Sequence, residues 1–133
     1  RTLSKKTGSP FKPCMIGLTC FDRQVLYDRI DRRVDKMLEE GLESEVREVY
    51  EKYKLRTAFN AIGFKEMIPY FEGNCSLDDA VGRIKQESRR YAKRQLTWFR
   101  RDVRIEWVDT ANSEQFDGII SNCLNIVAKS EIM

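Results

Sequence analysis

Basic side chains crowd one side of a helix predicted over residues 77–101, where they could bind phosphate groups. At about 100° per residue, an apolar side and a basic side separate along this helix. The apolar side carries Leu77, Val81, Ile84, Tyr91, Gln95 and Phe99. The basic side carries Arg89, Arg90, Lys93, Arg94, Arg100 and Arg101. Like charges this close repel one another, so we expect an anionic partner, and a nucleic-acid backbone is the natural one.

The residue types on this helix suit RNA, although charge alone leaves an alternative open. Arginine outnumbers lysine, and its planar guanidinium matches phosphates and base edges. Tyr91 and Trp98 could stack on a base, as aromatic residues of RNA-binding proteins do. The alternative is a solvated helix face with aromatic residues in the core. The charge pattern favours neither interpretation, but for Trp98 a core position is favoured.

A second group of charges lies on a helix predicted to begin after Asp22. Its arginines alternate with aspartates, and a surface of weak ion pairs is the favoured interpretation. The residues concerned are Arg23, Arg29, Arg32 and Arg33, with Asp22, Asp28, Asp31 and Asp35. Arg33 borders the apolar stripe of this helix, so its stem can pack while its guanidinium reaches a neighbouring element.

The composition excludes several kinds of chemistry. The chain has no histidine, which removes histidine-based acid–base catalysis, the Ser–His and Cys–His pairs and the usual zinc ligand sets. Its four cysteines are scattered, which favours reduced thiols in a cytosolic protein. The net charge of +3 is too small to indicate nucleic acid by itself. No apolar run is long enough to span a membrane.

The elements that must position these side chains are mostly helical. A short apolar run predicts a strand at about residues 15–20, and alternation of polar and apolar residues predicts a second at about 104–109. Apolar periodicity predicts five helices, at residues 22–40, 42–53, 59–71 and 77–101, and from a cap at Ser113 onward. Ser76 and Asp79 form a capping-box pattern before the fourth helix. Helices between two distant strands indicate an α/β sheet whose remaining strands lie outside this chain, and a start without methionine suggests a fragment.

Three segments together resemble one enzyme family. Residues 90–100 (Arg-Tyr-Ala-Lys-Arg-Gln-Leu-Thr-Trp-Phe-Arg) are similar to the R-x-A-K-R-Q-x-T-W-F-R signature of tRNA dimethylallyltransferases. Residues 61–66 (Ala-Ile-Gly-Phe-Lys-Glu) resemble the family's A-I-G-Y-K-E. Residues 29–46 resemble its R-I-x-x-R-V-x-x-M segment followed by G-L and E-V. The motifs occur in family order. The departures are mild, with Ser88 for a usual threonine and Phe64 for a usual tyrosine.

The resemblance implies transfer of a dimethylallyl group from its diphosphate to N6 of the tRNA adenine 3′ of the anticodon. The family fold is a three-layer α/β core like that of P-loop kinases. Residues 1–133 would be its C-terminal part, whereas the phosphate loop, general base and helical insertion would precede it. The resemblance also implies Mg²⁺ held mainly by residues outside this chain, a cytoplasmic location and a monomeric enzyme. This chain alone is expected to be inactive.

The resemblance also assigns site residues. Arg33 matches the family arginine that contacts the diphosphate, so we expect it to be the catalytic residue of this chain. Two segments match tRNA-contacting stretches of the family, and the second agrees with the charge argument. The expected tRNA-binding residues are Thr57, Ala58, Phe59, Asn60, Gln86, Arg89, Arg90, Lys93 and Arg94.

Three other functions remain open from the sequence. One is an RNA-binding module without chemistry, which would have no reason to keep Arg33 in its motif. Another is a protein-docking surface for an acidic partner. The third is an isopentenyltransferase that acts on free adenine nucleotides, against which the tRNA-type signature near residues 93–100 argues.

Overall fold

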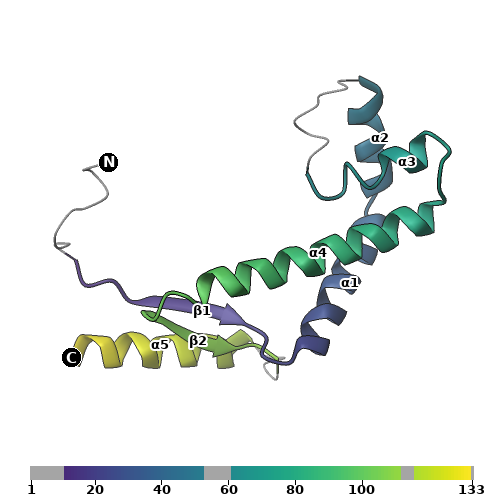
Figure 1. Ribbon diagram of the computed structural model, residues 1–133. Coiled ribbons are helices and arrows are strands. Elements are labelled where there is room, and N and C mark those ends of the chain that lie inside the picture. The colour runs from purple at the N-terminus through teal and green to yellow at the C-terminus, as the bar shows by residue number, and fades with distance from the viewer. Residues whose placement is uncertain (1–10, 53–60, 112–115, 133) are drawn as a thin grey trace, which may run out of the picture. The chain divides into compact units, whose positions relative to one another are not determined.

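The computed structural model describes residues 11–52, 61–111 and 116–132. The elements follow one another in the order β1, α1, α2, α3, α4, β2, α5 (Figure 1). By their contacts they divide into two compact units. One unit holds β1, β2 and α5, and the other holds α1 to α4.

The strands of the first unit form a parallel pair. β1 (Met15–Thr19) and β2 (Ile105–Asp109) run in register, with Met15 opposite Ile105 and Thr19 opposite Asp109. Both predicted strands are confirmed to within one residue. Parallel strands need a crossover connection of a dozen or more residues, and here the segment that contains α1 to α4 provides it. α5 (Phe116–Ile132) packs against β2, and Figure 1 shows it running along the two strands.

The carboxyl ends of the two strands are tied together by hydrogen bonds. The Asp109 carboxylate accepts from the backbone N–H of Phe21 at 3.1 Å and of Ala111 at 3.0 Å. Thr110 donates its backbone N–H to the carbonyl of Thr19 at 2.7 Å. The chain leaving β1 is thereby held beside the chain leaving β2.

The second unit is built around one hydrophobic core. α1 (Arg23–Glu39), α2 (Leu42–Lys52) and α4 (Leu77–Phe99) contribute buried residues to it, and α3 (Ile68–Phe71) is a single short turn. The buried side chains are Val34, Val46, Met67, Ala80, Val81 and Ile84. All three buried residues of α4 lie in its first eight positions. The rest of that helix therefore extends past the core.

Local signals set the helix ends. The Asp22 carboxylate accepts from the N–H of Gln24 at 3.0 Å and of Val25 at 3.3 Å, which confirms the predicted cap of α1. The capping box is confirmed too, since Asp79 N–H donates to Ser76 Oγ at 3.1 Å. The carboxylate of Asp79 in return accepts from the N–H of Ser76 at 3.4 Å.

The prediction of a helix over residues 59–71 is wrong for the described part. Residues 62–67 form turns, and only Ile68–Phe71 is helical. Gly63 has a φ of +102°, a left-handed conformation that interrupts an α-helix, and its N–H is bonded to the side chain of Glu66. Pro69 marks the true helix start, because its missing N–H is tolerated in a first turn.

Near the end of α4 the structure differs from two further predictions. The helix ends at Phe99 rather than at residue 101. Trp98, expected in the core, is 65% exposed, because the core touches only the first turns of α4. The predicted Ser113 cap lies outside the described residues.

We predict that Gly17→Ala destabilises the first unit. An added Cβ would lie 2.6 Å from two atoms of the Trp107 ring and 2.8 Å from Ile105 Cγ2, closer than packed atoms come. Overpacking of this kind costs roughly 1–3 kcal/mol. Urea unfolding followed by tryptophan fluorescence measures the loss.

The matched control is Gly82→Ala, which adds the same methyl group inside α4, where nothing lies within 4 Å apart from the chain neighbours and the backbone of the helix itself. Alanine there should raise stability by about 0.5–1 kcal/mol, because glycine weakens a helix interior. Equal effects of the two substitutions would contradict the tight Gly17–Trp107 packing.

Candidate nucleic-acid interface

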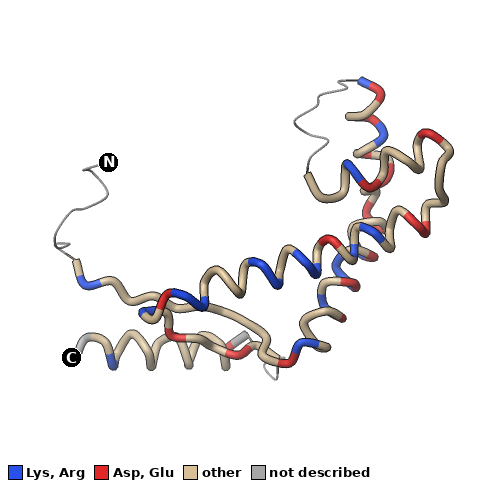
Figure 2. The backbone as a smooth tube through the Cα atoms, in the orientation of Figure 1, with Lys and Arg blue, Asp and Glu red and all other residues tan. Residues whose placement is uncertain are grey.

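The second half of α4 presents cations to solvent. Of the residues predicted to bind RNA here, Gln86, Arg90, Lys93 and Arg94 are exposed. Figure 2 shows the Lys and Arg positions recurring along this helix. Because no residue of α4 after Ile84 is buried, these side chains stand clear of the core. The predicted basic face is therefore present as an accessible surface.

The exposed cations of α4 differ in their interaction partners. Arg90 is paired with Glu87 one turn earlier, at 2.9 Å. Arg94 lies over the ring of Tyr91, with its guanidinium carbon 6.0 Å from the ring centre. Lys93 has no ion-pair partner within the part of the chain that the structure describes.

Arg89 has a different environment from its neighbours. Its Nη1 donates to Asp31 Oδ1 of α1 at 2.6 Å, and both side chains are about one-third exposed. One turn earlier, Lys85 Nζ lies 2.7 Å from Asp35 Oδ1. Two ion pairs thus join α1 to α4. Sequence reasoning treated these aspartates as partners of arginines on their own helix and missed their pairing with α4.

Arg33 lies on the side of α1 away from these ion pairs. It is two residues from both Asp31 and Asp35, which on a helix is a rotation of about 200°. The two carboxylates therefore face α4, whereas Arg33 is exposed on the other side of α1. Within the described residues it makes no ion pair, so its guanidinium is available to an anion.

The other predicted RNA-contacting segment, Thr57 to Asn60, lies outside the described residues. The turn that follows it is described, and it contains a buried carboxylate. Glu66 is 5% exposed, and its Oε2 accepts the N–H of Gly63 at 2.7 Å. Lys65, beside it, is about half exposed. Nothing in the sequence singled out these two residues beyond their place in the family motif.

Two carboxyl groups have pKa values lowered by a neighbouring guanidinium. A hydrogen bond from Arg47 lowers the pKa of Glu43, which also accepts from the Tyr70 hydroxyl at 3.3 Å. Hydrogen bonds from Arg104 lower the pKa of Asp102 to about 2. Neither group belongs to the predicted site. Glu43 and Arg47 join α2 to α3, and Asp102 lies in the turn after α4.

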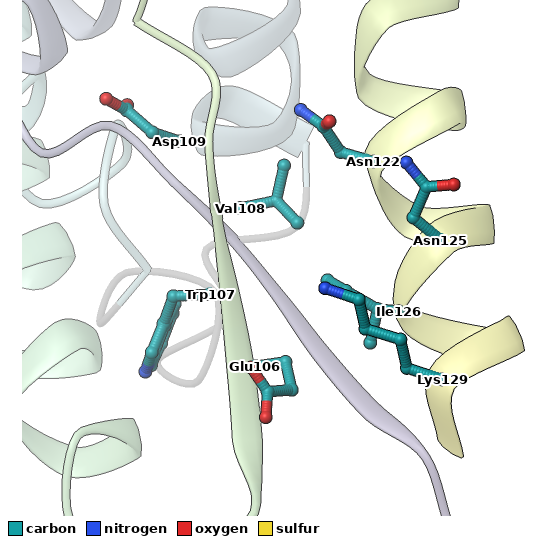
Figure 3. Close-up of a pocket in the computed structure, with 8 residues that line it drawn as sticks. All are labelled: Glu106, Trp107, Val108, Asp109, Asn122, Asn125, Ile126 and Lys129. Atoms are coloured by element: carbon teal, nitrogen blue, oxygen red, sulfur yellow. The ribbon is translucent and has the colours of Figure 1, made fainter. Parts of the chain in front are cut away.

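A pocket of about 430 Å³ lies between β2 and α5 in the first unit. Figure 3 shows Val108 of β2 facing Asn122, Asn125 and Ile126 of α5, while Trp107 projects from the opposite side of the strand. Glu106, Asp109 and Lys129 complete its lining. None of the residues predicted from sequence to form the site lines this pocket.

The described residues offer no group of three His, Cys, Asp or Glu side chains able to hold a metal ion. By themselves these described residues do not fit a Mg²⁺ site. Among the same residues, no helix combines the length and apolar character needed to cross a bilayer.

Comparison with known proteins identifies the family. The fold and the cationic helix define an α/β protein with an exposed basic face. Residues 1–102 match the profile of the IPP transferase family, so the chain belongs to that family. The tRNA dimethylallyltransferase of Halalkalibacterium halodurans is 46% identical over 125 residues, and that of Geobacillus thermodenitrificans is 52% identical over 108 residues.

Solved structures agree with this assignment. A tRNA isopentenylpyrophosphate transferase from Bacillus halodurans superposes with a TM-score of 0.80 over 97% of this chain, at 46% identity. One from Staphylococcus epidermidis gives 0.78 over 88%, at 36% identity. The match covers 43% and 38% of those two chains, and 39% and 34% of the two relatives above. The present chain therefore spans well under half the length of these proteins.

We predict that Asp31 and Arg89 stabilise the second unit as a coupled pair. Both are partly shielded from water, so a double-mutant cycle with Asp31→Asn and Arg89→Gln should give about 0.5–1 kcal/mol of coupling. Thermal unfolding of the four proteins measures it. Lys36 and Glu40, 3.9 Å apart and more than 60% exposed, form the control pair and should give less. Coupling no greater than that of the control would contradict the pairing.

Proposed function

We propose that this chain is the C-terminal part of a tRNA dimethylallyltransferase. The enzyme would join C1 of the dimethylallyl group to N6 of the adenine 3′ of the anticodon. The bond from C1 to the diphosphate oxygen breaks, diphosphate departs, and N6 loses a proton. The base that accepts this proton would belong to residues outside this chain.

One observation supports the RNA-binding role above all others. Arg90, Lys93 and Arg94 stand exposed on a helix that carries the family signature, and nothing in the core requires their charges. A row of cations on a rigid helix suits a phosphate backbone, because each neutralised phosphate releases counterions. The exposed rings of Tyr91 and Trp98 on the same helix suit an unstacked base. The target adenine would have to leave its stack to react.

Arg33 would contribute to the chemical step. It is exposed, it makes no ion pair among the described residues, and the helix that carries it is fixed to α4 through Asp31 and Asp35. A guanidinium placed at the departing diphosphate stabilises the negative charge that develops there. We assign Mg²⁺ and the phosphate loop of a kinase-like core to residues outside this chain. The cytoplasmic location and the monomeric state rest on the family resemblance and stay predictions.

The test is a chimera in which this chain replaces the aligned segment of the Halalkalibacterium halodurans relative. The purified chimera is incubated with dimethylallyl diphosphate, Mg²⁺ and an unmodified anticodon stem-loop. Formation of N6-dimethylallyl adenine, detected by mass spectrometry, would support the proposal. A chimera that folds and binds the stem-loop but forms no product would refute it. Free AMP as acceptor tests the nucleotide-type reaction, and its preferred use would also refute the proposal.

In that chimera, Arg33→Ala should lower kcat by roughly 100-fold or more, because the guanidinium acts mainly on charge that develops in the transition state. Affinity for the stem-loop should change less than about twofold. Arg32→Ala, one position away on the same helix, is the matched control. A parallel loss of RNA affinity and turnover would assign Arg33 to RNA binding instead.

Replacing Lys93 and Arg94 together by Gln should weaken binding of the stem-loop to the 133-residue chain. The slope of log K against log salt should flatten by about one to two units, since two phosphate contacts are lost. Fluorescence anisotropy at several salt concentrations measures the slope. The control is Lys12→Gln with Lys129→Gln, which removes two exposed cations from the first unit. An unchanged slope would place Lys93 and Arg94 away from RNA.

A further inference from the structure

Lys65 occupies a defined position between two carboxylates. Its Nζ lies 3.8 Å from Glu66 Oε1 and 4.0 Å from Glu87 Oε2 of α4. Glu87 is also paired through Oε1 with Arg90, at 2.9 Å. The four side chains of Lys65, Glu66, Glu87 and Arg90 thus form a connected cluster, which we call the Lys65 cluster. It joins the 62–67 turn to the RNA-facing stretch of α4.

The backbone beneath Lys65 is held without help from the lysine itself. Glu66 bonds the N–H of Gly63 through Oε2, and Met67, the next residue, is fully buried in the core. Glu66 Oε1 is buried and has no hydrogen-bond partner in the structure. That oxygen places a negative charge beneath the ammonium group. The conformation of the turn therefore does not depend on the Lys65 side chain. The turn in its own right fixes the position of the Lys65 backbone.

The hydrogen-bonding capacity of Lys65 remains unused. Distances of 3.8 and 4.0 Å bring electrostatic attraction but exceed the range of an N–H···O hydrogen bond. An ammonium group has three donors, and none has a hydrogen-bond acceptor among the described residues. An anionic oxygen arriving from solvent could take these bonds without breaking any that exist.

Within the Lys65 cluster the negative side chains are more buried than the positive ones. The carboxylate side chains are 4% exposed for Glu66 and 24% for Glu87. The cationic side chains are 47% exposed for Lys65 and 58% for Arg90. Although the formal charges of the cluster cancel, the side that meets solvent is positive. An approaching polyanion therefore meets two fixed cations, one from the turn and one from α4.

We infer that Lys65 is an RNA-binding residue that contacts a phosphate group of the bound stem-loop beside Arg90. This inference rests on the proposed tRNA-binding function, and it extends the RNA surface from α4 onto the 62–67 turn. Glu66 acts as a positioning residue, since it fixes the backbone of Lys65 through Gly63 and attracts the ammonium group from below.

The experiment is a salt titration of the 133-residue chain with a labelled anticodon stem-loop. Lys65→Gln should flatten the slope of log K against log salt by about 0.7–0.9, the value of one phosphate contact. Between about 50 mM and 200 mM salt, the affinity ratio should shrink by roughly threefold. Lys65→Arg keeps the charge and should keep the wild-type slope. Lys129→Gln, which removes one exposed cation from the first unit, is the matched control, and thermal unfolding verifies that each variant folds.

The outcomes separate this inference from the proposed function. If the wild-type chain prefers the stem-loop over a scrambled hairpin and Lys93→Gln flattens the slope, the RNA surface exists. A wild-type slope for Lys65→Gln would then overturn the inference alone, and so would a loss confined to binding of an acidic peptide. A wild-type chain without any salt-sensitive RNA binding would overturn both the inference and the RNA-binding part of the proposed function.

Discussion

The packing of the first turns of α4 is the constraint on which the candidate site depends. Ala80, Val81 and Ile84 are buried against Val34 of α1, Val46 of α2 and Met67 of the turn. Burial of such side chains stabilises by roughly 1.5–3 kcal/mol each for the larger ones, so this contact determines how α4 lies. Because the helix continues for four more turns beyond Ile84, its later residues have no core to enter. Charged side chains in this part of α4 therefore stay in contact with water, and no charge has to be buried.

Ion pairs then set the relation between α1 and α4. A hydrophobic contact alone would leave two helices free to slide by small amounts, since it has little directionality. Asp31 with Arg89 and Asp35 with Lys85 add two directional contacts, spaced one turn apart on both helices. The first of these pairs also neutralises Arg89, one of the cations that the sequence places on the basic face. The surface left for a nucleic acid is narrower than the charge pattern suggests, and it is centred on Arg90, Lys93 and Arg94.

This arrangement connects the two halves of the proposed chemistry within a single unit. Arg33 lies on α1 and the exposed cations proposed to bind RNA lie on α4, and the two helices share a core and two ion pairs. A residue that contacts the diphosphate and residues that hold the acceptor RNA would thus move together. Positioning of this kind matters for group transfer, because small displacements of reacting groups reduce rates greatly. The relatives extend far beyond the matched segment, which is consistent with catalysis that needs more than this chain.

The sequence by itself determined the features whose causes are local. The starts of α1 and α4 follow from Asp22, Ser76 and Asp79, because a cap bonds to residues only two or three positions away. The two strands were predicted to within a residue, β1 from a short apolar run and β2 from the alternation of polar and apolar residues. The exposed cations of α4 were predicted from helical periodicity, which depends only on spacing along the chain.

The tertiary structure decided the features that depend on which distant groups meet. The partners of Asp31 and Asp35 come from a helix more than fifty residues away, and no spacing rule along α1 identifies them. The exposure of Trp98 follows from where the core ends, and a helical wheel contains no such information. The burial of Glu66 follows from the left-handed turn at Gly63. Periodicity describes one element at a time, whereas these features arise only when elements pack together and charges come within bonding distance.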